Sequence, residues 1–124
     1  MNSALGWVKK SIDDNLLEIE SDLKRYIESN EPDLLEEVKQ GLGVTQGVLV
    51  MIEQYGAAML TEEMIALVDF IVNNKESKPE QSLEVLLRAV LQLPDYLEHI
   101  QSGQRDIPIA ILPLLNDVRA VRNQ

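Results

Sequence analysis

The chain has 124 residues and no cysteine, and 45% of its residues are hydrophobic. This length predicts a single domain, residues 1–124, and the absence of cysteine excludes disulfides, thiolate metal sites and cysteine nucleophiles. The net charge of −10 disfavours nucleic acid and anionic lipid as partners, since both are anionic themselves. We expect a cytoplasmic protein without membrane insertion, because no apolar run approaches the roughly 20 residues that span a bilayer and the first residues lack a signal-peptide pattern.

Much of the negative charge falls between Asp13 and Glu37. Ten acidic residues lie in this stretch, and only Lys24 and Arg25 oppose them. Such a stretch is typical of a solvated helix face that keeps a domain in solution. The alternative is an acidic docking surface for a basic partner, and both interpretations stay open at this point.

The first two predicted helices follow from apolar residues that recur at steps of three and four. The first runs from about Ser3 to Glu28, with a stripe made of Leu5, Val8, Ile12, Leu16, Ile19, Leu23 and Tyr26. Asn30 is a candidate N-cap for the second helix, which we expect to continue to a stop or sharp turn at Gly56. Its inward stripe is Leu35, Val38, Leu42, Thr45, Leu49 and Ile52.

Three more helices complete the prediction. The third buries Leu60, Met64, Leu67, Val68 and Ile71, and a polar loop over residues 73–81 follows it. The fourth begins near Glu80, ends near residues 102–103 and uses Leu83, Leu86, Leu87, Val90 and Leu91. Asp106 is a candidate cap for the fifth, with Pro108 in its first turn. Pro94 and Pro113 fall inside predicted helices, where each should kink or split the helix; we favour kinks.

The predicted fold is all-α, because no alternating run of β-branched residues bounded by turns is present. Long amphipathic helices joined by short loops pack best side by side and antiparallel. We therefore expect an antiparallel four-helix bundle with one additional helix.

Gly41, Gly43 and Gly47 lie within the second predicted helix, where each costs about 1 kcal/mol relative to alanine. One explanation is that the helix breaks at Gly41. The other is the close approach of another helix or of a partner, which the unbroken apolar stripe favours. Gly43 and Gly47 are four residues apart and so share one helix face. The residues predicted to form an outward interaction surface around them are Gln40, Gly43, Gln46, Gly47, Val50 and Gln54.

The stretch from Gly43 to Gly47 resembles the His-x-x-Lys-Gly motif of histidine-phosphotransfer (HPt) domains. Those domains are four-helix bundles that carry a phosphorylated histidine on an exposed helix face. Gly43 stands at the histidine position and Gln46 at the lysine position, so only Gly47 is retained. A neutral imidazole is the nucleophile of that chemistry, and Gly43 has no side chain. The motif also has a second glycine six residues after the first, where this chain has Glu53.

Longer segments resemble one HPt subgroup, the FimL-like domains at the start of ChpA/PilL-type hybrid chemosensory kinases. These segments are residues 4–9, 47–64, 91–98 and 112–120. The resemblance implies a bacterial chemosensory pathway that controls type IV pili and twitching motility. It also implies a scaffold role without enzymatic activity or cofactor. The implied partners are proteins: a receiver domain, other domains of the same kinase or a FimV-like pilus hub protein. Self-association, a phosphotransfer domain with a different acceptor and a dimerisation domain of a larger kinase remain alternatives.

Other candidate sites carry weaker signals. His99, the only histidine, is expected to be an ordinary surface or boundary residue. Thr45 and Thr61 are the hydroxyl candidates for phosphorylation, but Thr45 lies about 200° around the helix from Gly43 and should face the core. Glu53, Glu62 and Glu63 lack the additional ligands of a metal site. Packing anchors at the bundle end are the favoured interpretation of Trp7 and Tyr26, and a recognition surface is the alternative.

Overall fold

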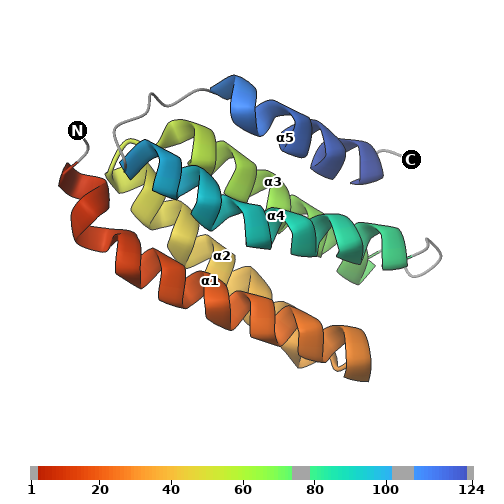
Figure 1. The fold of residues 1–124 in the computed structure, drawn as a ribbon. Helices are drawn as coiled ribbons and strands as arrows, with labels where there is room; N and C mark the ends of the chain where they lie inside the picture. Colours follow the sequence, from red (N-terminus) through yellow and green to blue (C-terminus); the bar gives the residue numbers. More distant parts are fainter. Residues whose placement is uncertain (1–2, 74–78, 102–107, 123–124) are drawn as a thin grey trace.

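The computed structural model describes residues 3–73, 79–101 and 108–122, and every regular element in these ranges is an α-helix (Figure 1). The all-α prediction is therefore confirmed for the described residues. The helices are α1 (Ser3–Ser29), α2 (Pro32–Met51), α3 (Tyr55–Asn73), α4 (Pro79–Gln101) and α5 (Pro108–Arg122).

The first four helices form a closed ring of contacts. Helix α1 packs against α2 and α4, and α3 completes the ring by packing against both α2 and α4. Helix α5 lies outside the ring against α3 and α4, as the upper layer in Figure 1 shows. This arrangement is consistent with the predicted bundle of four helices and one additional helix. It leaves the outer faces of α2 and α1 free of α5.

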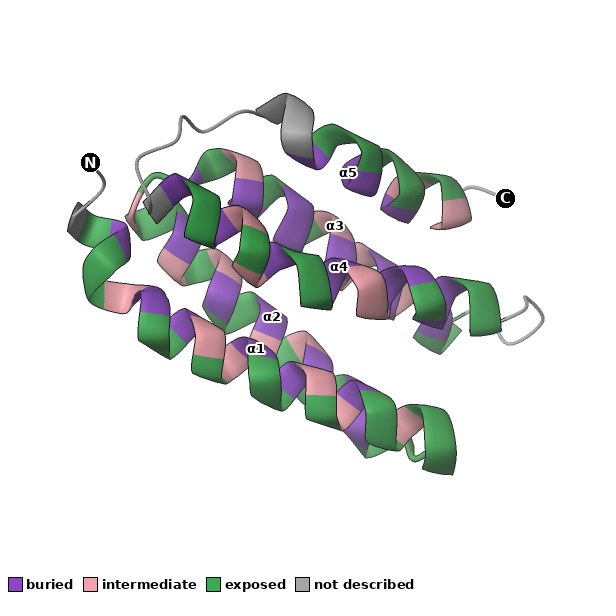
Figure 2. Ribbon diagram, viewed as in Figure 1, coloured by how far each residue is buried: buried purple, intermediate pink, exposed green. Residues whose placement is uncertain are grey.

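Most residues of the apolar stripes predicted for the first four helices are buried in the core, and α5 adds Ile111, Leu114, Leu115 and Val118 (Figure 2). Leu16, Leu42 and Leu67 are among the side chains with no more than 2% exposure. Burial of such stripes is the main driving force for helix packing in water. One predicted member is wrong: Leu91 is 46% exposed.

Two predicted helix boundaries around α2 are also wrong. Asn30 does not cap α2; it follows α1 with a left-handed φ of 58°, a conformation that asparagine tolerates well. Glu31 takes the N-cap position without a side-chain hydrogen bond, and Pro32 begins the helix. At the other end α2 stops at Met51, so that the expected stop residue, Gly56, belongs to the first turn of α3.

The turn between α2 and α3 is closed by two backbone hydrogen bonds. The amide of Glu53 donates to the carbonyl of Val50 at 3.0 Å, and the amide of Gln54 donates to the carbonyl of Leu49 at 2.8 Å. This pair of bonds defines a Schellman motif, whose central residue adopts a left-handed conformation. Glu53 takes that conformation, with a φ of 64°.

Helices α4 and α5 run unbroken through Pro94 and Pro113, so neither proline splits its helix. Pro108 opens α5 as predicted. Asp106, the expected cap of that helix, lies outside the described residues, as do residues 74–78 and 102–103. None of the described helices combines the length and apolar character needed to cross a membrane.

Candidate functional site

The outer face of α2 has a bare centre. Gly43 and Gly47 are exposed, and a Cβ atom added to either would meet nothing within 4 Å. Gln40 and Val50 are also exposed on this helix, and Gln46 is half-buried. The helix runs continuously through all five positions. Gly43 thus occupies an outward-facing position on an unbroken helix, as the sequence predicted. We call these five residues the α2 face.

Gln54 does not belong to the α2 face, and its prediction as an interaction residue is wrong. The side chain is 5% exposed, because α2 ends three residues earlier and the chain has already turned. The carbonyl of Gln54 accepts a hydrogen bond from the amide of Ala58 at 2.9 Å, at the start of α3. The helical spacing that placed Gln54 beside Val50 assumed a longer helix.

Gly41 has a different role from the other two glycines of α2. A Cβ atom there would lie 2.7 Å from Cγ1 of Ile19 on α1. The amide of Asn15, also on α1, donates to the carbonyl of Gly41 at 2.9 Å and to the hydroxyl of Thr45 at 2.6 Å. Gly41 therefore permits the close approach of α1, and the alternative of a helix break at this position is wrong.

The stretch of α2 that carries this face has no charge of its own, although Glu18, Asp22 and Glu37 line a shallow pocket together with Gln40 and Val44. Residues 40–52 contain no charged side chain. Val44 is 63% exposed and Met51 is 81% exposed on α2, and Tyr55 and Met59 are exposed on the first turns of α3. Depletion of charge together with exposed methionine and tyrosine is typical of protein interfaces. The sequence analysis missed this feature, although the uncharged stretch was a signal for it.

The two threonines are poorly placed to accept a phosphoryl group. Thr45 is 1% exposed and Thr61 is not exposed at all. The hydroxyl of Thr45 donates to the carbonyl of Gly41 at 3.0 Å, and that of Thr61 donates to the carbonyl of Ala57 at 2.8 Å. Both hydroxyls thus satisfy buried backbone groups, as expected for threonine inside a helix.

The aromatic residues of α1 behave differently from each other. Tyr26 packs against the core, as expected. Trp7 is 87% exposed, so its favoured interpretation as a packing anchor is wrong. The buried stripe of this part of α1 passes through Leu5 and Ile12, which places Trp7 on the opposite side of the helix.

Glu53, Glu62 and Glu63 have different surroundings in the structure. Glu53 and Glu62 are exposed, whereas Glu63 forms ion pairs with Arg119 and Arg122 and thereby ties α5 to α3. Within the described ranges no three His, Asp or Glu side chains are grouped so that they could hold a metal ion. His99 is exposed on α4.

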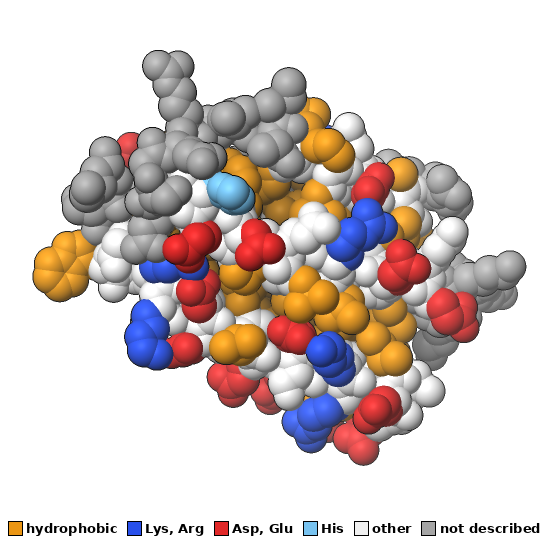
Figure 3. Space-filling view, in the orientation of Figure 1, with side chains coloured by type: hydrophobic (Ala, Val, Ile, Leu, Met, Phe, Trp, Pro, Cys, Tyr) orange, Lys and Arg blue, Asp and Glu red, His pale blue; other side chains and the backbone are white. Residues whose placement is uncertain are grey.

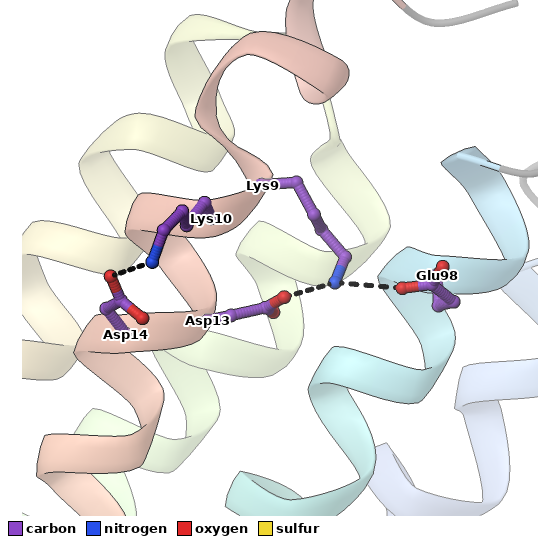
Figure 4. A network of polar contacts seen from close by, with 5 residues as sticks. All are labelled: Lys9, Lys10, Asp13, Asp14 and Glu98. Atoms are coloured by element: carbon purple, nitrogen blue, oxygen red, sulfur yellow. Dashed lines mark hydrogen bonds and ion pairs between the residues drawn. The ribbon is translucent and has the colours of Figure 1, made fainter.

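The face formed by α1 and α4 mixes both signs of charge around apolar side chains (Figure 3). Lys9 is 8% exposed and bridges the two helices, with its Nζ 2.6 Å from Asp13 and 3.3 Å from Glu98 (Figure 4). Burial lowers the pKa of Lys9, but the hydrogen bonds and charges of these two carboxylates outweigh burial and raise the pKa above its ordinary value of 10.5. Part of the acidic stretch of α1 is therefore internally paired.

The chain is similar to a known protein along nearly its whole length. The chain is 28% identical over 123 residues to the Scaffold protein FimL of Pseudomonas aeruginosa, an alignment that covers 98% of this chain and 22% of the relative. The chain thus spans about a fifth of the length of that protein. No family model matches the sequence, and no solved structure matches it.

Proposed function

We propose that this chain is a FimL-like, degenerate HPt domain: an antiparallel four-helix bundle with one additional helix that binds protein partners and does not relay phosphate. The observation that carries the proposal is the similarity to a scaffold protein along nearly the whole chain. The α2 face agrees with it, because an exposed, uncharged helix surface with a bare centre allows another protein to approach the backbone closely.

The α2 face offers no group that could accept a phosphoryl group. Gly43 has no side chain, and the exposed residues Gln40, Val44 and Val50 carry no nucleophile. Gln46 at the motif's lysine position is uncharged and cannot balance phosphate charge as an ammonium group would. The buried hydroxyls of Thr45 and Thr61 count against a phosphotransfer domain with a non-histidine acceptor, which is the alternative proposal.

Glu53 stands where the motif has its second glycine, which is a departure from the HPt resemblance. The backbone at Glu53 has a left-handed φ of 64°, a conformation that glycine adopts most easily.

The proposed partners are proteins of the pathway that the resemblance implies. They are a receiver domain, other domains of a larger chemosensory kinase and a FimV-like pilus hub protein, in a system that controls type IV pili and twitching motility. A structural or dimerisation domain of such a kinase is the second alternative. Sedimentation at several concentrations tests it, and a stable dimer in the absence of any partner would favour it.

Transfer of label tests the phosphate part of the proposal. The chain is incubated with an active kinase domain of the pathway and labelled ATP, and separately with a phosphorylated receiver domain. We expect no acid-labile or base-labile label on the chain, and a conventional HPt domain from the same pathway serves as the positive control. Label that accumulates on this chain at the rate of the control would establish the phosphotransfer alternative instead.

A further inference from the structure

A shallow pocket lies between α1 and α2, and its volume is about 220 Å³. Its polar or exposed lining residues are Asn15, Glu18 and Asp22 of α1 with Glu37, Gln40 and Val44 of α2. Small-molecule sites usually have volumes of roughly 300–1,000 Å³. This pocket is smaller, so we expect it to take a single side chain of a partner rather than a free ligand.

The pocket adjoins the α2 face, because Gln40 belongs to both. Val44, which follows Gly43 in α2, also lines the pocket and is 63% exposed. A protein that approaches the bare backbone at Gly43 and Gly47 therefore comes within reach of the pocket.

The polar groups that the pocket offers to an occupant are mainly hydrogen-bond acceptors. Glu18 and Glu37 are exposed, and neither forms an ion pair within the described part of the chain. Asp22 lies 3.6 Å from Arg25, so three carboxylates face one guanidinium. Asn15 uses its amide nitrogen for hydrogen bonds to α2, which leaves its oxygen as an acceptor. A complementary side chain is therefore a cation that donates hydrogen bonds.

Charge argues against a second copy of this chain as the source of that cation. Every lysine and arginine within residues 3–73, 79–101 and 108–122 already forms an ion pair with a carboxylate. The net charge of each copy is −10, so a second copy brings more negative than positive charge to the pocket. A basic side chain of another protein instead meets Glu18 and Glu37, which no cation of the described chain neutralises.

Building on the proposed binding role of the α2 face, we propose that its protein partner presents an apolar patch with one arginine or lysine at the edge. The apolar patch covers Gly43, Val44 and Gly47, and the basic side chain enters the pocket beside Glu18 and Glu37. Complementary charge of this kind fixes the register in which two surfaces meet. The pocket thus orients the partner on a helix face that has no charge of its own.

Two synthetic peptides that differ in one residue test this proposal. One carries leucine and methionine around a central arginine, and the second has citrulline there, which keeps nearly the same shape without the charge. Binding is followed by amide chemical shifts of the isotope-labelled chain. We expect saturable shifts in residues 15–22 and 37–47, and about fivefold tighter binding of the arginine peptide. Equal affinities, shifts centred elsewhere or no saturable shift with the arginine peptide would overturn the proposal.

Two neighbouring glutamates of α2 provide matched variants. Glu37 lines the pocket and Glu36 does not, and both are exposed. We expect Glu37→Gln to weaken binding of the arginine peptide about threefold and Glu36→Gln to have little effect. A general attraction to negative charge would act nearly equally on both variants, so equal losses would contradict a specific pocket. Circular dichroism verifies that both variants fold.

The pocket proposal and the proposed function can fail separately. Shifts on the α2 face with equal affinities for the two peptides would retain that face as a binding surface and overturn the pocket. Phosphate label on a chain that binds the arginine peptide as expected would overturn the proposed function and retain the pocket. A dimer that forms in the absence of peptide and is weakened by Glu37→Gln would identify a second copy as the occupant and overturn the choice of a basic partner.

Discussion

At the scale of single residues, the three glycines of α2 need two different physical explanations. Gly41 makes room for Ile19 of α1, whereas Gly43 and Gly47 face open space. Packing therefore explains the first glycine and not the other two, each of which costs α2 stability without relieving any contact within the described chain. A bare helix surface that is retained at such a cost is the feature that the proposed partner would use.

Alanine substitutions should distinguish these glycines. We expect Gly43→Ala to stabilise the fold by about 0.5–1 kcal/mol, since alanine is the better helix former and its Cβ meets nothing. Gly41→Ala should destabilise it by about 1–3 kcal/mol, because its Cβ collides with the buried Ile19. Urea unfolding of both variants provides the measurement. A loss of stability in Gly43→Ala would show that the α2 face is packed against something in the free protein.

The same open space should accommodate a restored motif. Gly43→His together with Gln46→Lys is expected to fold with an unchanged helix content, because neither new side chain has to enter the core. The exposure of Gly43 could be predicted from sequence, since the apolar stripe of α2 fixes which side of the helix faces the core. The burial of Gln54 could not, because it depends on the end of the helix and no glycine marks that end.

At the scale of elements, the ends of α2 depend on backbone conformations that the residue types at those positions do not predict. Glycine is the usual residue at the left-handed position of a Schellman motif, and here the position is filled by Glu53. The sequence analysis therefore carried α2 on to Gly56, which is the nearest glycine. Apolar periodicity located the helices well, but it is weak evidence for where a helix stops.

Glu53→Gly tests this account of the turn. A left-handed conformation costs a residue with a Cβ about 1–2 kcal/mol, and glycine avoids this cost. Part of the resulting stabilisation is offset by the greater freedom of glycine in the unfolded chain. We expect a net stabilisation of about 0.5–1 kcal/mol in thermal or urea unfolding. Glu53→Gln is the control, because it removes the charge and keeps the strained conformation. Equal stabilisation by both variants would assign the effect to charge and would contradict the conformational explanation.

At the scale of the whole molecule, Lys9 joins α1 to α4 through a partly buried charge. It falls four residues after Leu5 and three before Ile12, so it occupies the register of the buried stripe. The sequence analysis assigned that place to Val8, the neighbouring apolar residue, which is only half-buried. Glu98 on α4 supplies the carboxylate from the other helix that makes burial of Lys9 favourable. Because Glu98 is distant from Lys9 in sequence, the residue pattern alone could not reveal the pair.

Lys9→Met should lower the free energy of unfolding by about 1–3 kcal/mol at neutral pH, because it leaves Asp13 without its cation. The pKa of Lys9 is raised in the folded chain. Its contribution is therefore fully present below pH 10.5 and is lost as the pH rises through the raised pKa. Urea unfolding from pH 8 to 12 should show the gap between wild type and Lys9→Met closing at the alkaline end.

Lys10→Met is the matched control for that series. Lys10 pairs with Asp14 at the same spacing, but both side chains are exposed, so a loss of only about 0.3–0.5 kcal/mol is expected. The bridge between α1 and α4 does not stabilise the fold if Lys9→Met lowers the free energy of unfolding by no more than Lys10→Met does. The same conclusion follows if the difference between wild type and Lys9→Met widens with pH.

The central claim is that the α2 face binds a protein partner, and one titration tests it most directly. The wild-type chain, Gly47→Arg and Ala120→Arg are each titrated calorimetrically with the purified receiver domain and with the FimV-like hub protein. Both substitutions add the same charge at an exposed helix position, on α2 and on α5 respectively. The account predicts that the wild type binds one of these proteins. It also predicts that Gly47→Arg weakens that binding at least about tenfold and that Ala120→Arg leaves it nearly unchanged. Binding that both variants retain equally, or no binding by the wild type, would contradict it.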